Sequence, residues 1–164
     1  MNKPSMARLK DCKPSGRIPF EFLTPIVWPS TNDIPGNWQA ALPIKRSFID
    51  QSYWIISSAK NRAIKAGILE KTRPHIPGPA RIDVVLHLPG PQHDYCNYVS
   101  DGMKWLIDLL RVPQSKTDAC KTHLHILRGD TTRDLLRGEF DIVDNSTPTR
   151  AIITLTELED PEHA

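Results

Sequence analysis

Residues 80–111 read ARIDVVLHLPGPQHDYCNYVSDGMKWLIDLLR, and this stretch decides the fold. Its first part, 80–88, is rich in valine, isoleucine and leucine and ends at a Pro-Gly-Pro turn, which predicts a buried strand. Its second part, 95–111, carries apolar side chains at helical spacing, through Tyr95, Val99 and Leu106. A strand followed by a helix of this length indicates a sheet packed against helices.

The segments on either side extend this pattern in both directions. The expected order is a strand over 18–27, a turn-rich stretch without regular structure over 28–43, a helix over 46–66 that ends at Gly67, the strand and helix described above, a strand over 121–128, a long loop or irregular insertion over 129–147 and a strand over 150–157. We therefore predict one compact α/β (α+β) domain over 18–164, with a mixed sheet and two main helices. A basic, poorly ordered arm over 1–17 precedes it.

Composition sets limits on the class of protein. The chain has 164 residues, a formal net charge of +2 and three cysteines, Cys12, Cys96 and Cys120. This charge is only a weak pointer to nucleic acid, because dedicated binders are usually more basic. An odd, sparse set of cysteines predicts no disulfide framework and makes the cytoplasm the expected location. No apolar run is long enough for a membrane helix, so we expect no membrane partner.

Two short stretches hold most of the residues with metal-binding or catalytic chemistry. Residues 93–97 read His-Asp-Tyr-Cys-Asn at the start of a predicted helix, and 115–118 read Ser-Lys-Thr-Asp before a predicted strand. Asp94 and Asp118 could hold one divalent ion if the helix start and the strand start lie side by side. The competing interpretation is structural: Asp94 sits where a helix N-cap belongs, and Asp118 suits a turn.

The arrangement of the chain resembles the RusA family of Holliday junction resolvases over about 18–157. The resemblance is carried by a Trp-Pro-Ser-Thr-Asn turn at 28–32, a strand that ends in proline at 84–89, the motif Asp-Tyr-Cys-Asn at 94–97 and the turn Thr-Asp-Ala at 117–119. The family pattern for the third of these is Asp-x-Asp-Asn at the start of a helix.

The resemblance implies a dimeric, Mg²⁺-dependent endonuclease, with Mn²⁺ as a substitute, that cuts four-way DNA junctions in recombination and repair. Asp94 and Asp118 would be its metal-binding and catalytic carboxylates, and Asn97 a catalytic motif residue beside them. A homodimer suits a junction, because two-fold symmetry places one site on each of two equivalent strands.

Two departures from the family pattern concern catalysis. Cys96 stands where the family has its second motif aspartate, and Ser100 stands where the family has a lysine. A thiol is a poor ligand for Mg²⁺, which prefers oxygen donors. A junction-binding protein of the same fold that no longer cuts is therefore the alternative to an active nuclease. Lys104, one helical turn further on, is a candidate substitute for the missing lysine.

A zinc site competes for the same residues. His93 and Cys96, together with Cys120 and His123, have the spacing of two pairs of zinc ligands. Against it, Cys120 and His123 would point to opposite faces of a regular strand. A zinc-stabilised DNA-binding module is the third hypothesis.

Basic residues indicate where DNA would bind. The candidates for phosphate contacts are Lys45, Arg46, Lys60, Arg62, Lys104, Lys116 and Lys121. Any one of them is as easily explained as a solvated surface charge. Trp28 and Trp38 are candidates for stacking on unpaired bases, or alternatively for anchoring the long loop.

Overall fold

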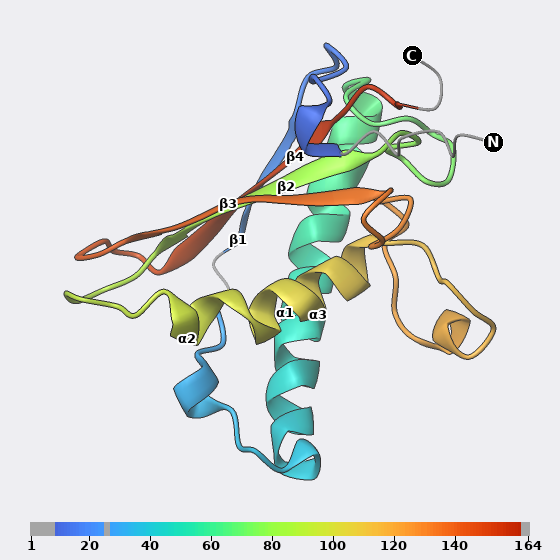
Figure 1. The fold of residues 1–164 in the computed structure, drawn as a ribbon. Helices are drawn as coiled ribbons and strands as arrows, with labels where there is room; N and C mark the ends of the chain where they lie inside the picture. Colours follow the sequence, from blue (N-terminus) through green and yellow to red (C-terminus); the bar gives the residue numbers. More distant parts are fainter. Residues whose placement is uncertain (1–8, 25–26, 162–164) are drawn as a thin grey trace, which may run out of the picture.

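The computed structural model describes residues 9–24 and 27–161. Its sheet has four strands, β1 (Phe20–Thr24), β2 (Ala80–His87), β3 (Leu135–Val143) and β4 (Arg150–Glu157). Its helices are α1 (Trp38–Lys65), α2 (Cys96–Val99) and α3 (Asp101–Leu110), with three 3₁₀ turns, η1 (Leu9–Asp11), η2 (Thr31–Asp33) and η3 (Asp118–Cys120). The predicted compact α/β domain with a mixed sheet and two main helices is confirmed (Figure 1).

The strands lie in the order β1-β4-β2-β3. β4 is antiparallel to both of its neighbours, whereas β2 and β3 are parallel. A parallel pair needs a crossover connection, and α2 and α3 form it. The two helices therefore leave the sheet after β2 and return the chain to it at β3.

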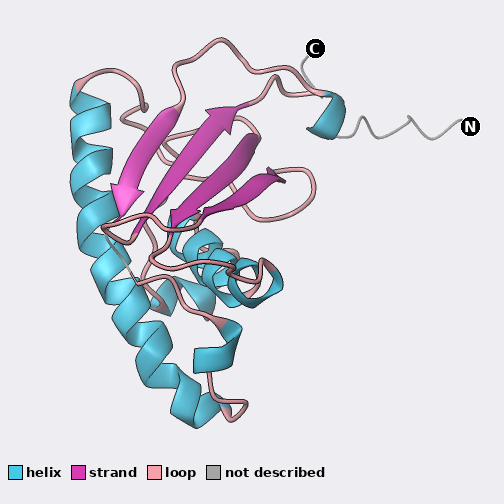
Figure 2. Ribbon diagram, turned by 90° about the vertical axis from the view of Figure 1, so that its left-hand side faces the viewer, coloured by secondary structure: helices cyan, strands magenta, loops and turns pink. Residues whose placement is uncertain are grey.

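One face of the sheet forms the core. Burial alternates along β1 and β2, as expected for strands with one covered face. Phe48, Ile56 and Ala63 on α1 pack into the same cluster as Leu106 and Leu110 on α3. Figure 2 shows α1 running along one side of the sheet and extending beyond its end.

α1 begins earlier than the sequence predicted. Residues 38–43 were assigned to a turn-rich stretch because of their prolines, and that prediction is wrong. Asn37 caps the helix, with its side-chain oxygen accepting a hydrogen bond from Gln39 N at 2.9 Å, and Pro43 is accommodated near the start. Within the described ranges, each helix is too short or too polar to cross a bilayer.

The single helix predicted over 95–111 is two helices that meet at Ser100. The turn before α1 holds this junction: Trp28 Nε1 donates to Tyr98 O at 2.7 Å, and Thr31 Oγ1 donates to Asn97 O at 3.0 Å. Gly102 lies directly against the Trp28 indole, where a Cβ atom would overlap the ring. The helix is therefore interrupted where Trp28 packs closely against it.

The third and fourth predicted segments exchange roles. Residues 129–147, predicted as a loop, contain β3, and residues 121–128, predicted as a strand, stay outside the sheet. Leu124 N and Ile126 N donate to Leu109 O and Leu110 O, both at 2.7 Å, so this extended segment satisfies carbonyls at the end of α3. Its alternating pattern is real, but its partner is a helix end rather than a strand.

Most of the predicted N-terminal arm that can be described is attached to the domain. Leu9 is buried, Pro14 bridges to Leu158, and Arg17 forms ion pairs with Glu70 at 2.6 Å and Glu157 at 3.2 Å. A poorly ordered arm is therefore wrong for 9–17. Residues 1–8 lie outside the described residues.

Candidate functional site

Asp94 stands immediately before α2 and is exposed. Its Oδ1 accepts a hydrogen bond from Cys96 N at 2.9 Å, which is the behaviour of a helix-capping carboxylate. The Cys96 thiol, at the position of the family aspartate, is also exposed. Asn97 is half-buried, and its backbone carbonyl rather than its amide side chain has the described contact, with Thr31.

His93 ties this turn to the loop between β3 and β4. Its Nδ1 lies 2.6 Å from Asp144 Oδ1, and its backbone N donates to the same oxygen at 3.3 Å. The hydrogen bond from His93 lowers the pKa of Asp144, which favours the ionised carboxylate there. The end of α2 that carries Asp94 therefore has a second carboxylate nearby, but one already engaged by an imidazole.

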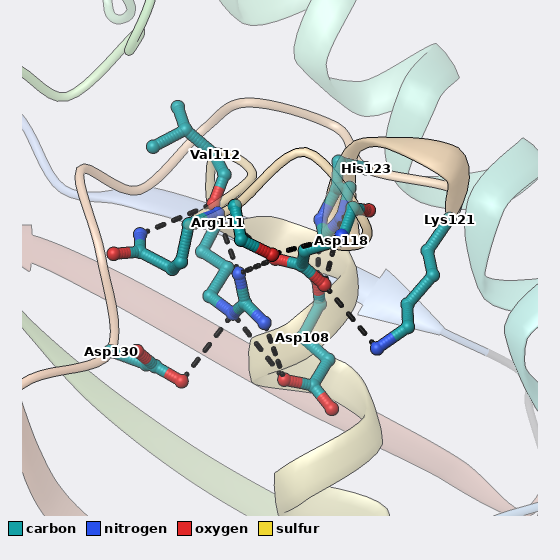
Figure 3. Close-up of polar contacts among 9 residues, drawn as sticks. Asp108, Arg111, Val112, Asp118, Lys121, His123 and Asp130 are labelled. Atoms are coloured by element: carbon teal, nitrogen blue, oxygen red, sulfur yellow. Dashed lines mark hydrogen bonds and ion pairs between the residues drawn. The ribbon is translucent and has the colours of Figure 1, made fainter.

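Asp118 belongs to a different environment, which Figure 3 shows. It is buried at 7% exposure, and its carboxylate receives a close ion pair from Arg111 and a hydrogen bond from Gln114 N at 2.9 Å. Lys121 Nζ lies 3.4 Å from its other oxygen. The hydrogen bond from Arg111, followed by that from Gln114, holds the pKa of Asp118 well below its usual range.

Arg111 is the centre of this cluster. It follows the last residue of α3, and its guanidinium also contacts Asp108 at 3.2 Å and Asp130 at 3.4 Å. One buried cation thus joins three carboxylates from α3, the 111–118 loop and the 128–134 turn. This arrangement fixes the loop after α3 to the domain.

His123 completes the cluster from the segment that caps α3. Its Nδ1 lies 2.9 Å from Asp108 O and its Nε2 lies 3.0 Å from Asp118 O. Both neighbours are acceptors, and only a ring that carries hydrogen on both nitrogens can donate to both. Asp118 Oδ1, 3.6 Å from Nε2, is the carboxylate that would balance such a ring.

The structure does not bring the two predicted metal-binding carboxylates together. Asp94 precedes α2, whereas Asp118 lies beyond the far end of α3, in η3 (Figure 1). α3 alone separates them by about 15 Å at 1.5 Å per residue. Among residues 9–24 and 27–161, no three His, Cys, Asp or Glu side chains are grouped so that they could hold a metal ion. One Mg²⁺ shared by Asp94 and Asp118 does not fit this arrangement.

The four predicted zinc ligands are divided in the same way. His93 and Cys96 lie at α2, and His123 lies at the end of α3 with both ring nitrogens facing carbonyl oxygens. The side chain of Cys120 lies outside the described residues. The described members of this set therefore do not share a zinc site.

The predicted DNA-binding residues are spread over several surfaces. Lys104, Lys116 and Lys121 are exposed, and the last of these pairs with Asp118. On α1, Lys60 and Arg62 point to nearly opposite sides, because two residues turn a helix by about 200°. Arg62 donates to Ser58 Oγ at 2.8 Å on its side.

Along the helix, Arg46 lies about 40° round from Lys60, so the two share a side, with Lys45 about 60° from Lys60 in the other direction. The basic residues of α1 therefore divide between two sides of the helix. Lys60 is half-buried on one of them and Arg62 is exposed on the other.

Trp28 and Trp38 have different roles. Trp28 is 4% exposed, with its ring centroid 5.7 Å from Phe48 and 5.8 Å from Phe140, so it is a core residue and unavailable for stacking on bases. Trp38 is 71% exposed at the first turn of α1, and its stacking role stays a prediction.

No protein-family model matches the sequence, and no curated protein is significantly similar to it. The residues that sequence reasoning missed are Arg111 and Asp144. Arg111 resembled one more surface charge at a helix end, and only its position beside Asp118 distinguishes it. Asp144 lay in a segment expected to be a loop, so nothing in the sequence connected it to His93.

Proposed function

We propose that this protein binds branched DNA on a RusA-like fold without cutting it. The observation that carries the proposal is the position of Asp118: its carboxylate is bound by Arg111 and Gln114 N at the opposite end of α2–α3 from Asp94. A carboxylate held by a buried guanidinium is occupied as a counter-ion, so it is poorly suited to replace water around Mg²⁺. Cys96 removes a further oxygen ligand from the other end.

The DNA-binding part of the proposal rests on the resemblance and on exposed basic residues. Lys104, Lys116 and Lys121 lie along and beyond α3, where they are accessible to a phosphate backbone. A homodimer would present two copies of this surface with the two-fold symmetry of a four-way junction. We propose a cytoplasmic location on the same basis.

The test measures binding and cleavage separately on one set of substrates. A labelled four-way junction, a three-way branch and a linear duplex of matched length are titrated with the protein in EDTA, and then incubated with Mg²⁺ or Mn²⁺. We expect tighter binding to the branched substrates, steep weakening with salt, and intact strands after incubation. Sedimentation of the complex gives the number of protomers per junction.

Each alternative has its own outcome in the same experiment. Symmetric cutting that requires Mg²⁺ would establish the alternative, an active metal-dependent endonuclease. Equal affinity for duplex and junction would contradict branch recognition. Stoichiometric zinc in the purified protein would support the zinc-stabilised module and contradict the separation of its ligands described above.

A further inference from the structure

Three segments that are distant in the sequence bring basic side chains together beside α1. Lys60 lies in the second half of α1, Arg73 and His75 lie in the loop before β2, and His125 lies in the segment that caps α3. Backbone hydrogen bonds join the last two segments: His75 N donates to His125 O at 3.1 Å. Ile76 N donates to Ile126 O at 2.9 Å, so the contact extends over two residues.

The backbone directs His125 away from the core. Leu124 and Ile126 are 2% and 0% exposed, whereas His125 between them is half-buried and has a φ of 55°. Histidine is among the few residues that adopt this left-handed conformation with any frequency. It allows both neighbours to be buried while the imidazole is presented at the surface.

The electrostatic evidence agrees with this geometry. Burial, followed by the charge of Arg73, lowers the pKa of Lys60. Burial also lowers the pKa of His125, and the charges of Arg73, His123, Lys60 and His75 lower it further. Like charges that act on one another in this way raise the free energy of the folded protein unless an anion lies between them.

No carboxylate of the described segments fills that role. Within residues 9–24 and 27–161, the ion pairs include none from Lys60, Arg73 or His125. Asp118, which contacts the neighbouring His123, is already bound by Arg111. The three cationic groups therefore share a partly desolvated surface without a protein counter-ion.

We propose that Lys60, Arg73 and His125 form a binding site for a phosphate group. A phosphate oxyanion accepts several charge-assisted hydrogen bonds at once and supplies the missing negative charge. Its source is either free inorganic phosphate or the backbone of bound DNA, and the second source rests on the function proposed above. The site is separate from Asp94 and from the motif that carries the family resemblance.

The first arm of the test uses inorganic phosphate and the histidine ring signals of the intact protein. Phosphate is added at constant ionic strength, with chloride as the balancing anion. We expect the His125 ring signals to move saturably and the pKa of His125 to rise, because a bound anion stabilises the imidazolium. Signals that move no more than in chloride would overturn the proposal.

Variants locate the effect. In Lys60→Gln with Arg73→Gln, the saturable shift of His125 is expected to disappear. Lys65→Gln is the matched control, since it removes the same charge from the same helix about 140° round from Lys60. An equal loss in Lys65→Gln would mean that general charge, not this site, attracts phosphate, and would also overturn the proposal.

The second arm uses the four-way junction and distinguishes the two sources. If DNA phosphate occupies the site, the double variant lowers the slope of log K against log salt by about two, with about one for each lost contact. An unchanged slope together with phosphate binding assigns the site to free phosphate. Phosphate binding without any DNA binding means that the proposed function fails and the site stands. DNA binding without phosphate binding, and with an unchanged slope, means the reverse.

Discussion

The two ends of the α2–α3 segment carry one aspartate each and treat it differently. Asp94, before α2, is exposed and accepts one backbone hydrogen bond from Cys96. Asp118, beyond α3, is 7% exposed and is surrounded by Arg111, Lys121 and His123. The residue type is the same, but one carboxylate faces solvent and the other is enclosed by cations.

The helix dipole explains part of this difference. A carboxylate at the amino end of a helix meets positive partial charge and needs no further partner. A carboxylate at the carboxyl end meets negative partial charge, so Asp118 requires compensating cations, and Arg111 is the one it contacts most closely. Metal-binding chemistry is therefore more available to Asp94 than to Asp118.

The largest expected effect comes from removing the cation at the enclosed end. Arg111→Met deletes the guanidinium, whose side chain is 9% exposed, and leaves Asp118 without its main counter-ion. We expect Tm to fall on the order of 10 °C in thermal unfolding at pH 7. The matched control is Lys121→Met, because Lys121 also contacts Asp118 but its side chain is 70% exposed. A loss as large in the control would show that Arg111 has no special role.

The next effect tests how the other end is held. Gly102→Ala places a methyl group against the indole of Trp28, which is 4% exposed and has little room to move. Overpacking of this kind costs about 1–3 kcal/mol, measurable by chemical denaturation. Gly36→Ala is the control, since nothing lies within 4 Å of the Cβ position there. Equal stability of the two variants would contradict the close approach of Trp28 to α3.

Acid should reveal the enclosed carboxylate. The folded-state pKa of Asp118 is lowered, so its contribution to stability is present above its ordinary value of 3.8 and is lost as the pH falls toward the folded value. We expect the Tm difference between the wild type and Asp118→Asn to be constant above about pH 5 and to shrink below about pH 4. A difference that stays constant down to pH 2 would exclude a strongly paired carboxylate.

The smallest effect concerns the exposed end. Replacing His93 by Gln removes the imidazole that contacts Asp144, and the pKa of Asp144 should rise toward that of an ordinary carboxyl. Carboxyl carbon signals followed through a pH titration measure this, and Tm should change little because both groups are partly exposed. An unmoved titration of Asp144 would mean that the two residues do not pair in solution.

Local sequence patterns predicted some elements well and others in the wrong role. β2 and β4 follow their apolar patterns, and the stripe of Phe48 and Ala63 marks the buried side of α1. β3 was missed because it has polar and glycine positions, and Gly138 is needed where Asp83 approaches a bulge in the sheet. Its partner β2 makes it a strand, and that partner is distant in the sequence.

The candidate site shows the same limit. The motif at 94–97 marked a real helix start, and the capping interpretation of Asp94 agrees with its contact to Cys96. Whether Asp94 and Asp118 meet depends on the path of the chain after α3. That path is fixed by Arg111 and by the segment that satisfies the carbonyls of Leu109 and Leu110.

The sequence by itself determined the fold class, the two main helices and the strands β2 and β4, because apolar periodicity and proline breaks are local properties of the chain. Only the tertiary structure decided which charges meet. An ion pair depends on where two backbones are placed, and burial then sets its strength. For this reason Asp118 is enclosed by Arg111, while Lys60, Arg73 and His125 lie together without a carboxylate of the described chain between them.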